Sequence, residues 1–150
     1  QSPFSERMKV ELADFKTFES EEKYDIIVSN PPYFEANNST KDILARQNVE
    51  LNFSELIEKS AMHLSEKGLF SVIIPSDSAA DFIEICEAQH LFLRKKINIF
   101  GMKNGALKRN ILEFSFTPNN VEETDFVIEK SPRTYSEEYL KLTEDFHIFG

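Results

Sequence analysis

Apolar residues in this chain gather in short runs, each bounded by polar residues, glycine or proline. Residues 24–29 (YDIIVS) and 68–76 (GLFSVIIPS) are continuous and rich in β-branched residues, whereas residues 8–14 (MKVELAD) alternate. A continuous apolar run is typical of a parallel strand that is covered on both faces. The pattern therefore predicts three strands, and the runs at 24–29 and 68–76 both lead into proline.

Two segments repeat their apolar residues at helical spacing. The first helix is predicted over about 52–65, with Ser54 as an N-cap variant and Gly68 just past its end. The second is predicted to run from a cap at residue 76 or 77 to about 89. On its inner face, Cys86 is expected to be a small core residue and not a nucleophile.

The rest of the chain continues this alternation. Further strands are predicted at 93–100, 110–116 and 125–130, and the part at 136–145 reads as a helix. Residues 35–50 are polar without a clear period, which indicates a mobile loop over a site. Strands alternating with helices predict an open α/β sheet in one domain, with ligands bound beyond the carboxyl ends of the strands.

Composition narrows the class of protein. The chain has 150 residues, of which 41% are hydrophobic, and a single cysteine, so we expect one globular domain in a reducing, cytoplasmic setting. No apolar run is long enough for a membrane span, and no signal peptide opens the chain. The histidines show no metal-ligand spacing and are expected to be structural or superficial. They are His63, His90 and His147.

Charge is distributed unevenly. The formal net charge of −9 argues against a nucleic-acid partner, yet the stretch from His90 to Leu112 contains no acidic residue. Two interpretations are open: the cations of this basic strip bind phosphate, or they are solubilising charges at strand ends. The cations are Arg94, Lys95, Lys96, Lys103, Lys108 and Arg109.

The residues after the run at 24–29 carry the clearest chemistry. Pro31 and Pro32 stiffen the chain and offer carbonyls without N–H donors, and Pro31 keeps Asn30 out of helical geometry. The Asn30 side-chain oxygen and the Pro31 carbonyl would suit a planar NH₂ group, and Tyr33, with Phe34 beside it, offers a flat surface on which a base would stack. The alternative is a strand-ending turn with the aromatic residues packed inward.

Several segments of the sequence, including the one that contains Asn30, resemble those of a known family. DIIVSNPPYF is similar to motif IV of the S-adenosylmethionine-dependent amino-methyltransferases, in which Asn or Asp, two prolines and an aromatic residue hold the target NH₂. Together with SPFSERMKVELADF, ARQNVELNFSELI and YSEEYLKLTEDFHIF, it closely resembles the bacterial tRNA(Val) adenine N6-methyltransferases, which modify adenine 37 beside the anticodon. The resemblance covers essentially the whole chain and implies a Rossmann-like class I methyltransferase sheet, mostly parallel with an antiparallel C-terminal strand.

The resemblance assigns roles to individual residues. It implies that Asn30, Pro31, Pro32 and Tyr33 are catalytic, with Asn30 and Pro31 on the adenine amine and Tyr33 on the base. It further implies S-adenosylmethionine as the cofactor, bound by Asp14, Phe15 and Asn30, and tRNA as the partner. The RNA-binding set is Phe34, Arg46 and the basic strip, whereas a surface arginine remains an equal interpretation of Arg46. No metal and no membrane partner is expected.

One part of the family pattern is absent. No Gly-rich cofactor loop occurs, so we expect the chain to be a C-terminal piece that lacks the N-terminal strands, two of which would lie centrally between its first two strands. Such a piece is expected to bind cofactor poorly, to be inactive alone, and to rearrange its sheet or pair with another copy.

Alternatives to the leading function stay open. The same motif occurs in guanine N2-methyltransferases and in enzymes that methylate a protein glutamine amide, and the isolated chain would also fit a non-catalytic RNA-binding or oligomerising module.

Overall fold

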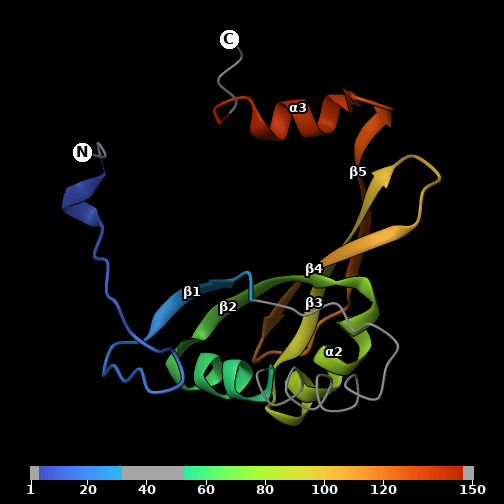
Figure 1. The fold of residues 1–150 in the computed structure, drawn as a ribbon. Helices are drawn as coiled ribbons and strands as arrows, with labels where there is room; N and C mark the ends of the chain where they lie inside the picture. The colour runs from blue at the N-terminus through green and yellow to red at the C-terminus, as the bar shows by residue number, and fades with distance from the viewer. Residues whose placement is uncertain (1–3, 32–52, 147–150) are drawn as a thin grey trace, which may run out of the picture.

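The computed structural model describes residues 4–31 and 53–146, and its strands form one six-stranded sheet in the order β1-β2-β4-β3-β5-β6 (Figure 1). β1 pairs with β2, and β3 with β5, in parallel, whereas β2/β4, β3/β4 and β5/β6 are antiparallel. The sheet is thus mixed: β1, β2, β3 and β5 run in one direction, and β4 and the short β6 run in the other. The strands are β1 (Tyr24–Ser29), β2 (Leu64–Pro75), β3 (Phe92–Met102), β4 (Leu107–Ser115), β5 (Glu122–Ser131) and β6 (Thr134–Tyr135).

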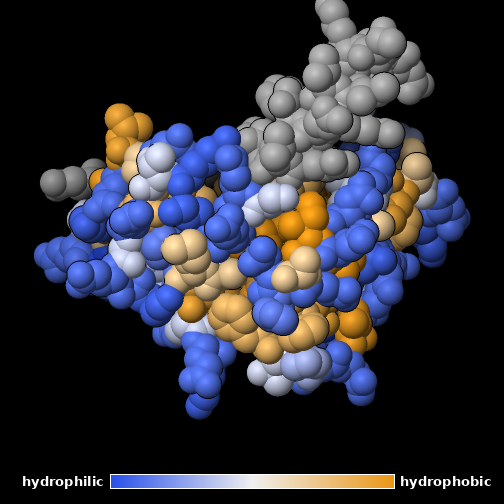
Figure 2. Space-filling model, turned by 90° about the horizontal axis from the view of Figure 1, so that it is seen from below, coloured by the Kyte–Doolittle hydropathy of each residue, from blue (hydrophilic) through white to orange (hydrophobic). Residues whose placement is uncertain are grey.

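Two helices cover one face of this sheet. Helical residues 53–63 and α2 (Ala79–Ala88) lie below the strands in Figure 1 and supply buried residues that pack against alternate residues of β2 and β4. Seen from that side, the surface is largely hydrophilic, with apolar side chains showing near its middle (Figure 2). The buried core includes Phe53, Ile57, Phe70, Val72, Ile74, Phe82, Cys86, Leu91, Leu112 and Phe114.

The second strand begins earlier than the sequence predicts. The first helix ends at residue 63 and β2 starts at once with Leu64, so Gly68 lies inside a strand and does not terminate the helix. The Leu64 side chain folds over Gly68, where a Cβ atom would come within 2.7 Å of Leu64 Cδ1. The glycine is therefore explained by this close approach, next to an irregularity in the β1/β2 register.

Two expectations about the chain up to the end of β1 are wrong. Residues 8–14 are not a strand, because within the described chain no neighbouring backbone pairs with them, and their alternating Val10 and Leu12 are exposed. β1 forms as predicted and is parallel to β2, but it is not covered on both faces: Ile26 is 64% exposed and Val28 is 74% exposed. In the described residues the outer edge of β1 has no partner strand.

The remaining elements confirm the pattern, apart from the cap of the second helix. The short 3₁₀ turn η2 (Ser76–Ser78) precedes α2, whose N-cap residue is Ser78. No side chain caps the helix: Ser78 Oγ donates to Asp77 Oδ1 (3.3 Å), and Ser76 Oγ donates to Leu107 O (3.1 Å). α3 (Glu137–Thr143) is capped by Ser136, whose hydroxyl accepts from Tyr139 N at 3.0 Å. Among the described helices, none has the length and apolarity needed to cross a membrane.

Cys86 is expected to be unreactive in the folded chain. Its side chain is fully buried on α2, and burial raises the pKa of the thiol, so the reactive thiolate is scarce at neutral pH. A thiol reagent at pH 8 should label the folded protein far more slowly than the protein in concentrated urea. Because the unfolded thiol ionises first, stability should also fall as pH rises above about 8.5. Rapid labelling of the folded chain would contradict a core role.

Candidate functional site

The ends of β1 and β2 meet at one edge of the sheet. Ser29, the last residue of β1, is paired with Val72 of β2, and both strands run in the same direction. Asn30 therefore follows β1 at the edge where Pro75 ends β2. Pro75 is in turn paired with Arg109 of β4, so that β4 begins at this same carboxyl edge.

Asn30 and Pro31 differ in their surroundings. The Asn30 side chain is exposed, whereas Pro31 is buried and holds the chain where it leaves the strand. A buried, conformationally fixed proline next to an exposed amide is suited to present the amide oxygen in one direction. The other residues predicted for this site lie outside the described residues: Pro32, Tyr33, Phe34 and Arg46.

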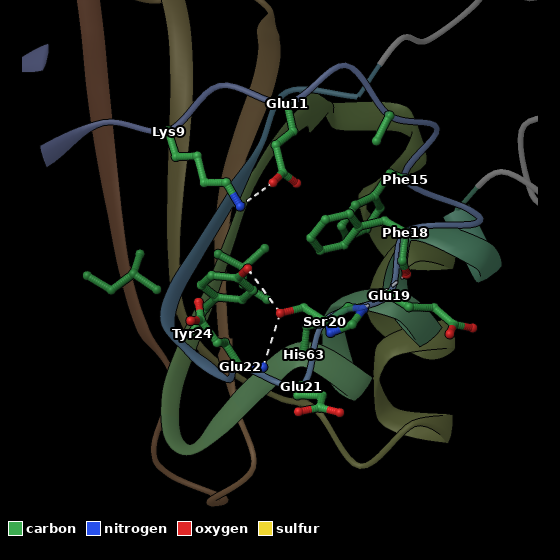
Figure 3. A pocket seen from close by; sticks show the side chains of 13 residues that line it. Lys9, Glu11, Phe15, Phe18, Glu19, Ser20, Glu21, Glu22, Tyr24 and His63 are labelled. Carbon is green, nitrogen blue, oxygen red and sulfur yellow. Dashed lines mark hydrogen bonds and ion pairs between the residues drawn. The ribbon is translucent and has the colours of Figure 1, made fainter. Parts of the chain in front are cut away.

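A cleft of about 790 Å³ separates the N-terminal segment from β1 (Figure 3). We refer to it as the β1 cleft, and its volume is within the range of ligand pockets. Phe15 and Phe18 line it with their rings 6.2 Å apart and nearly parallel, and Ile26 and Ile27 contribute apolar surface from β1. An open aromatic and apolar surface of this kind fits a planar group.

Two of the three residues predicted to bind the cofactor, Asp14 and Phe15, lie beside this cleft or line it, whereas the third, Asn30, follows the end of β1. Phe15 lines the cleft directly and is partly exposed. Asp14 precedes it, and its Oδ1 accepts a hydrogen bond from Lys16 N at 3.0 Å, which fixes the carboxylate while leaving further acceptor positions. A carboxylate next to an exposed ring fits an adenine with its exocyclic amine.

His63 lines this cleft as a buried residue, which agrees with the structural role expected for it. It is 96% buried, since only 4% of its surface is exposed, its Nε2 lies 3.3 Å from Phe18 O, and its ring meets Phe18 edge-on. Its buried Nδ1 has no hydrogen-bond partner among the described residues. In the sequence, His63 is a single histidine at the end of a predicted helix, and no pattern indicates that it contacts Phe18. Within the described ranges, no group of three His, Cys, Asp or Glu residues is placed to hold a metal ion.

The basic strip is divided between the two ends of β3. Arg94 is paired with Glu113 at 3.1 Å, Lys95 with Glu122 at 3.4 Å and Lys96 with Glu123 at 3.0 Å. The other three cations, Lys103, Lys108 and Arg109, lie at the β3–β4 turn or close to it, at the carboxyl edge. At about 3.3 Å per residue, the nine steps from Arg94 to Lys103 span roughly 30 Å. The six cations therefore extend along the whole of β3, with Arg109 between the two ends, opposite Ile99.

The fold is that of a class I methyltransferase. The crystal structure of a protein described as a predicted O-methyltransferase, from Agrobacterium tumefaciens, matches with a TM-score of 0.70 and 15% sequence identity. The match covers 94% of this chain and 64% of that one, and at this identity it concerns the fold. The chain belongs to the Eco57I restriction-modification methylase family, whose model matches residues 3–100.

Curated relatives are closer in sequence. A tRNA1(Val) (adenine(37)-N6)-methyltransferase of a Flavobacteriaceae bacterium (strain 3519-10) is 50% identical over 150 residues, which are 99% of this chain. A protein of the same name from Bacteroides thetaiotaomicron is 32% identical over 151 residues. The chain spans 65% and 64% of the length of these two relatives.

Proposed function

We propose that the protein transfers a methyl group from S-adenosylmethionine to the exocyclic N6 of adenine in tRNA, at position 37 of tRNA(Val). The observation that carries this proposal is the exposed Asn30 beside the buried Pro31, at the carboxyl edge of a methyltransferase sheet. The relative that is 50% identical over the whole chain supports the choice of tRNA adenine. Such a substrate implies a cytoplasmic site of action.

The Asn30 side-chain oxygen and the Pro31 carbonyl accept hydrogen bonds from the two N–H groups of the adenine amine. The lone pair of this nitrogen is delocalised into the purine, so the free amine is a poor nucleophile. The two acceptors favour the pyramidal amine and stabilise the positive charge that develops as the nitrogen attacks. Because these interactions strengthen in the transition state, they act on rate more than on binding.

Asp14 and Phe15 bind the adenine end of S-adenosylmethionine in this proposal. The ring of Phe15 in the β1 cleft provides the stacking surface, and the Asp14 carboxylate accepts from the cofactor's own adenine amine. The bound cofactor supplies a methyl group activated by its sulfonium. Tyr33 stacks on the target base, and Phe34 and Arg46 contact RNA.

Loss of the protein should remove N6-methyladenosine from tRNA. tRNA from cells that lack the protein and from cells that produce it would be digested to nucleosides and measured by mass spectrometry, with the reintroduced gene as the control. N6-methyladenosine at position 37 is expected to disappear in the first sample and to return in the control. Loss of N2-methylguanosine, or of methylated glutamine in protein, with N6-methyladenosine intact would contradict the proposal.

A further inference from the structure

We propose that four cations at the carboxyl edge of the sheet bind phosphates of the RNA that flanks the target adenine. We refer to them as the edge cations: Lys103, Lys108, Lys130 and Arg133. This inference rests on the proposed function, because it takes RNA as the substrate. It assigns the RNA contact to two residues of the basic strip, Lys103 and Lys108, and adds Lys130 from β5 and Arg133 from the turn that follows it.

The strand register brings the edge cations together. Met102 of β3 is paired with Glu129 of β5, so Lys103 and Lys130 are the next residues of two adjacent parallel strands. Lys108 lies at the start of β4, across the turn that Gly105 N closes with Met102 O at 2.9 Å. Figure 1 shows the β3–β4 turn and the end of β5 at the same upper end of the molecule, near α3.

The same topology places the edge cations on the side of Asn30. β1, β2, β3 and β5 all run toward this edge, and β4 begins there. With about 4.8 Å between neighbouring strands, the four steps from β1 to β5 amount to roughly 19 Å across the sheet. The strand pairings place Asn30 level with Ile97 of β3 and Thr124 of β5, so Lys103 and Lys130 each lie six residues, roughly 20 Å, further along their strands. The backbone separation from Asn30 to Lys130 is then roughly 28 Å, which corresponds to about eight stacked nucleotides at about 3.4 Å each. The edge cations are thus within reach of RNA whose base lies at Asn30.

The first half of the strip and the edge cations differ in their ion pairs. Arg94, Lys95 and Lys96 are each paired with a glutamate, and hydrogen bonds from Asn98 and Lys96 hold the pKa of Glu123 below its usual range. In the described part of the chain, no ion pair joins any edge cation to an acidic residue, and all four side chains are exposed. When cations without such partners bind phosphates, the counterions condensed on the nucleic acid are released, which favours binding.

Arg133 adds an observation from the backbone. It lies in the two-residue turn between Ser131 and Thr134, which are paired, and has a φ of 62°, in the left-handed region. Glycine or asparagine is the usual residue at such a turn position, and a larger side chain there costs of order 1 kcal/mol. An arginine at this strained position is therefore better explained by what its side chain binds than by the turn itself.

Two double variants with the same change of net charge test the proposal. We expect Lys103→Ala with Lys108→Ala to weaken tRNA binding by roughly 5-fold per cation at 0.15 M salt, about 25-fold in total, and to lower the salt slope of log K by about 1.4–1.8. Lys95→Ala with Lys96→Ala, which removes cations that already have glutamate partners, should leave both nearly unchanged. Binding would be followed by fluorescence anisotropy of labelled tRNA, and folding by thermal unfolding.

Arg133→Gly separates binding from stability. The substitution relieves the left-handed φ, so the melting temperature should stay the same or rise, while tRNA binding weakens by roughly 5-fold. Equal weakening by the two double variants, or an unchanged salt slope, would overturn the proposal and leave adenine methylation intact. If the unchanged protein binds no tRNA at all, both this proposal and the RNA substrate fail, and the nucleoside measurement on cellular tRNA tests the latter independently.

Discussion

Replacing Asn30 by Ala is expected to lower the rate of adenine methylation by roughly 10²–10³-fold, the usual effect of removing one group that stabilises charge in a transition state. Asn30 is exposed, so the substitution leaves no cavity and should not change the melting temperature. The effect should appear in kcat more than in KM, because the acceptor acts on the developing positive charge. The effect would be measured as the initial rate of N6-methyladenosine formation, with the protein purified from the cells that produce it.

Asn30→Asp provides the matched control for this prediction. It retains an oxygen acceptor at the same distance from the backbone, so it should recover a large part of the rate that Asn30→Ala loses. An Asn30→Ala protein with an unchanged kcat, or one with a raised KM alone, would show that the side chain only contributes to binding. Equal losses in the two variants would indicate that the amide N–H, and not the oxygen, is the group that matters.

The parts of the fold that were predictable are those defined by local pattern. The run at 24–29 and the helical spacing of Phe53, Ile57 and Ser60 identify β1 and the first helix, because burial of one face requires that spacing. Residues 8–14 alternate as clearly, but a strand also needs a neighbouring backbone, and the β1 cleft lies between this segment and β1. The alternation therefore predicted a strand at 8–14, but in the described residues no neighbouring strand pairs with this segment.

The candidate site, like the fold, has parts that the sequence predicts and parts that it does not. Asn30 and Pro31 could be proposed from the sequence, because one tetrapeptide contains both acceptors. The division of the basic strip could not, because Glu113, Glu122 and Glu123 meet its first half only through cross-strand register. The sequence does not group Lys130 with Lys103 for the same reason, because only the β3/β5 pairing makes these distant residues neighbours.

Replacing Phe82 by Ala is expected to destabilise the fold by about 3–5 kcal/mol, a large part of the 5–15 kcal/mol typical of such a domain. Phe82 is fully buried on α2, and its ring lies 5.0 Å from Phe53, 6.2 Å from Phe70 and 6.0 Å from Phe114. It thus joins α2 to the first helix, β2 and β4 at once. Urea unfolding followed by circular dichroism should show a midpoint lowered by roughly 1–3 M.

Two further variants test whether a loss of stability at position 82 comes from the loss of core packing. Phe82→Leu keeps most of the apolar volume and should cost clearly less than Phe82→Ala, because the remaining cavity is smaller. Phe146→Ala removes an aromatic ring that is 85% exposed and should change the free energy of unfolding by less than about 0.5 kcal/mol. If Phe82→Ala were as mild as Phe146→Ala, the aromatic cluster would not be the core that holds the helices against β2 and β4. The position of Asn30 depends on that core, since β2 is the one strand that pairs with β1 among the described residues.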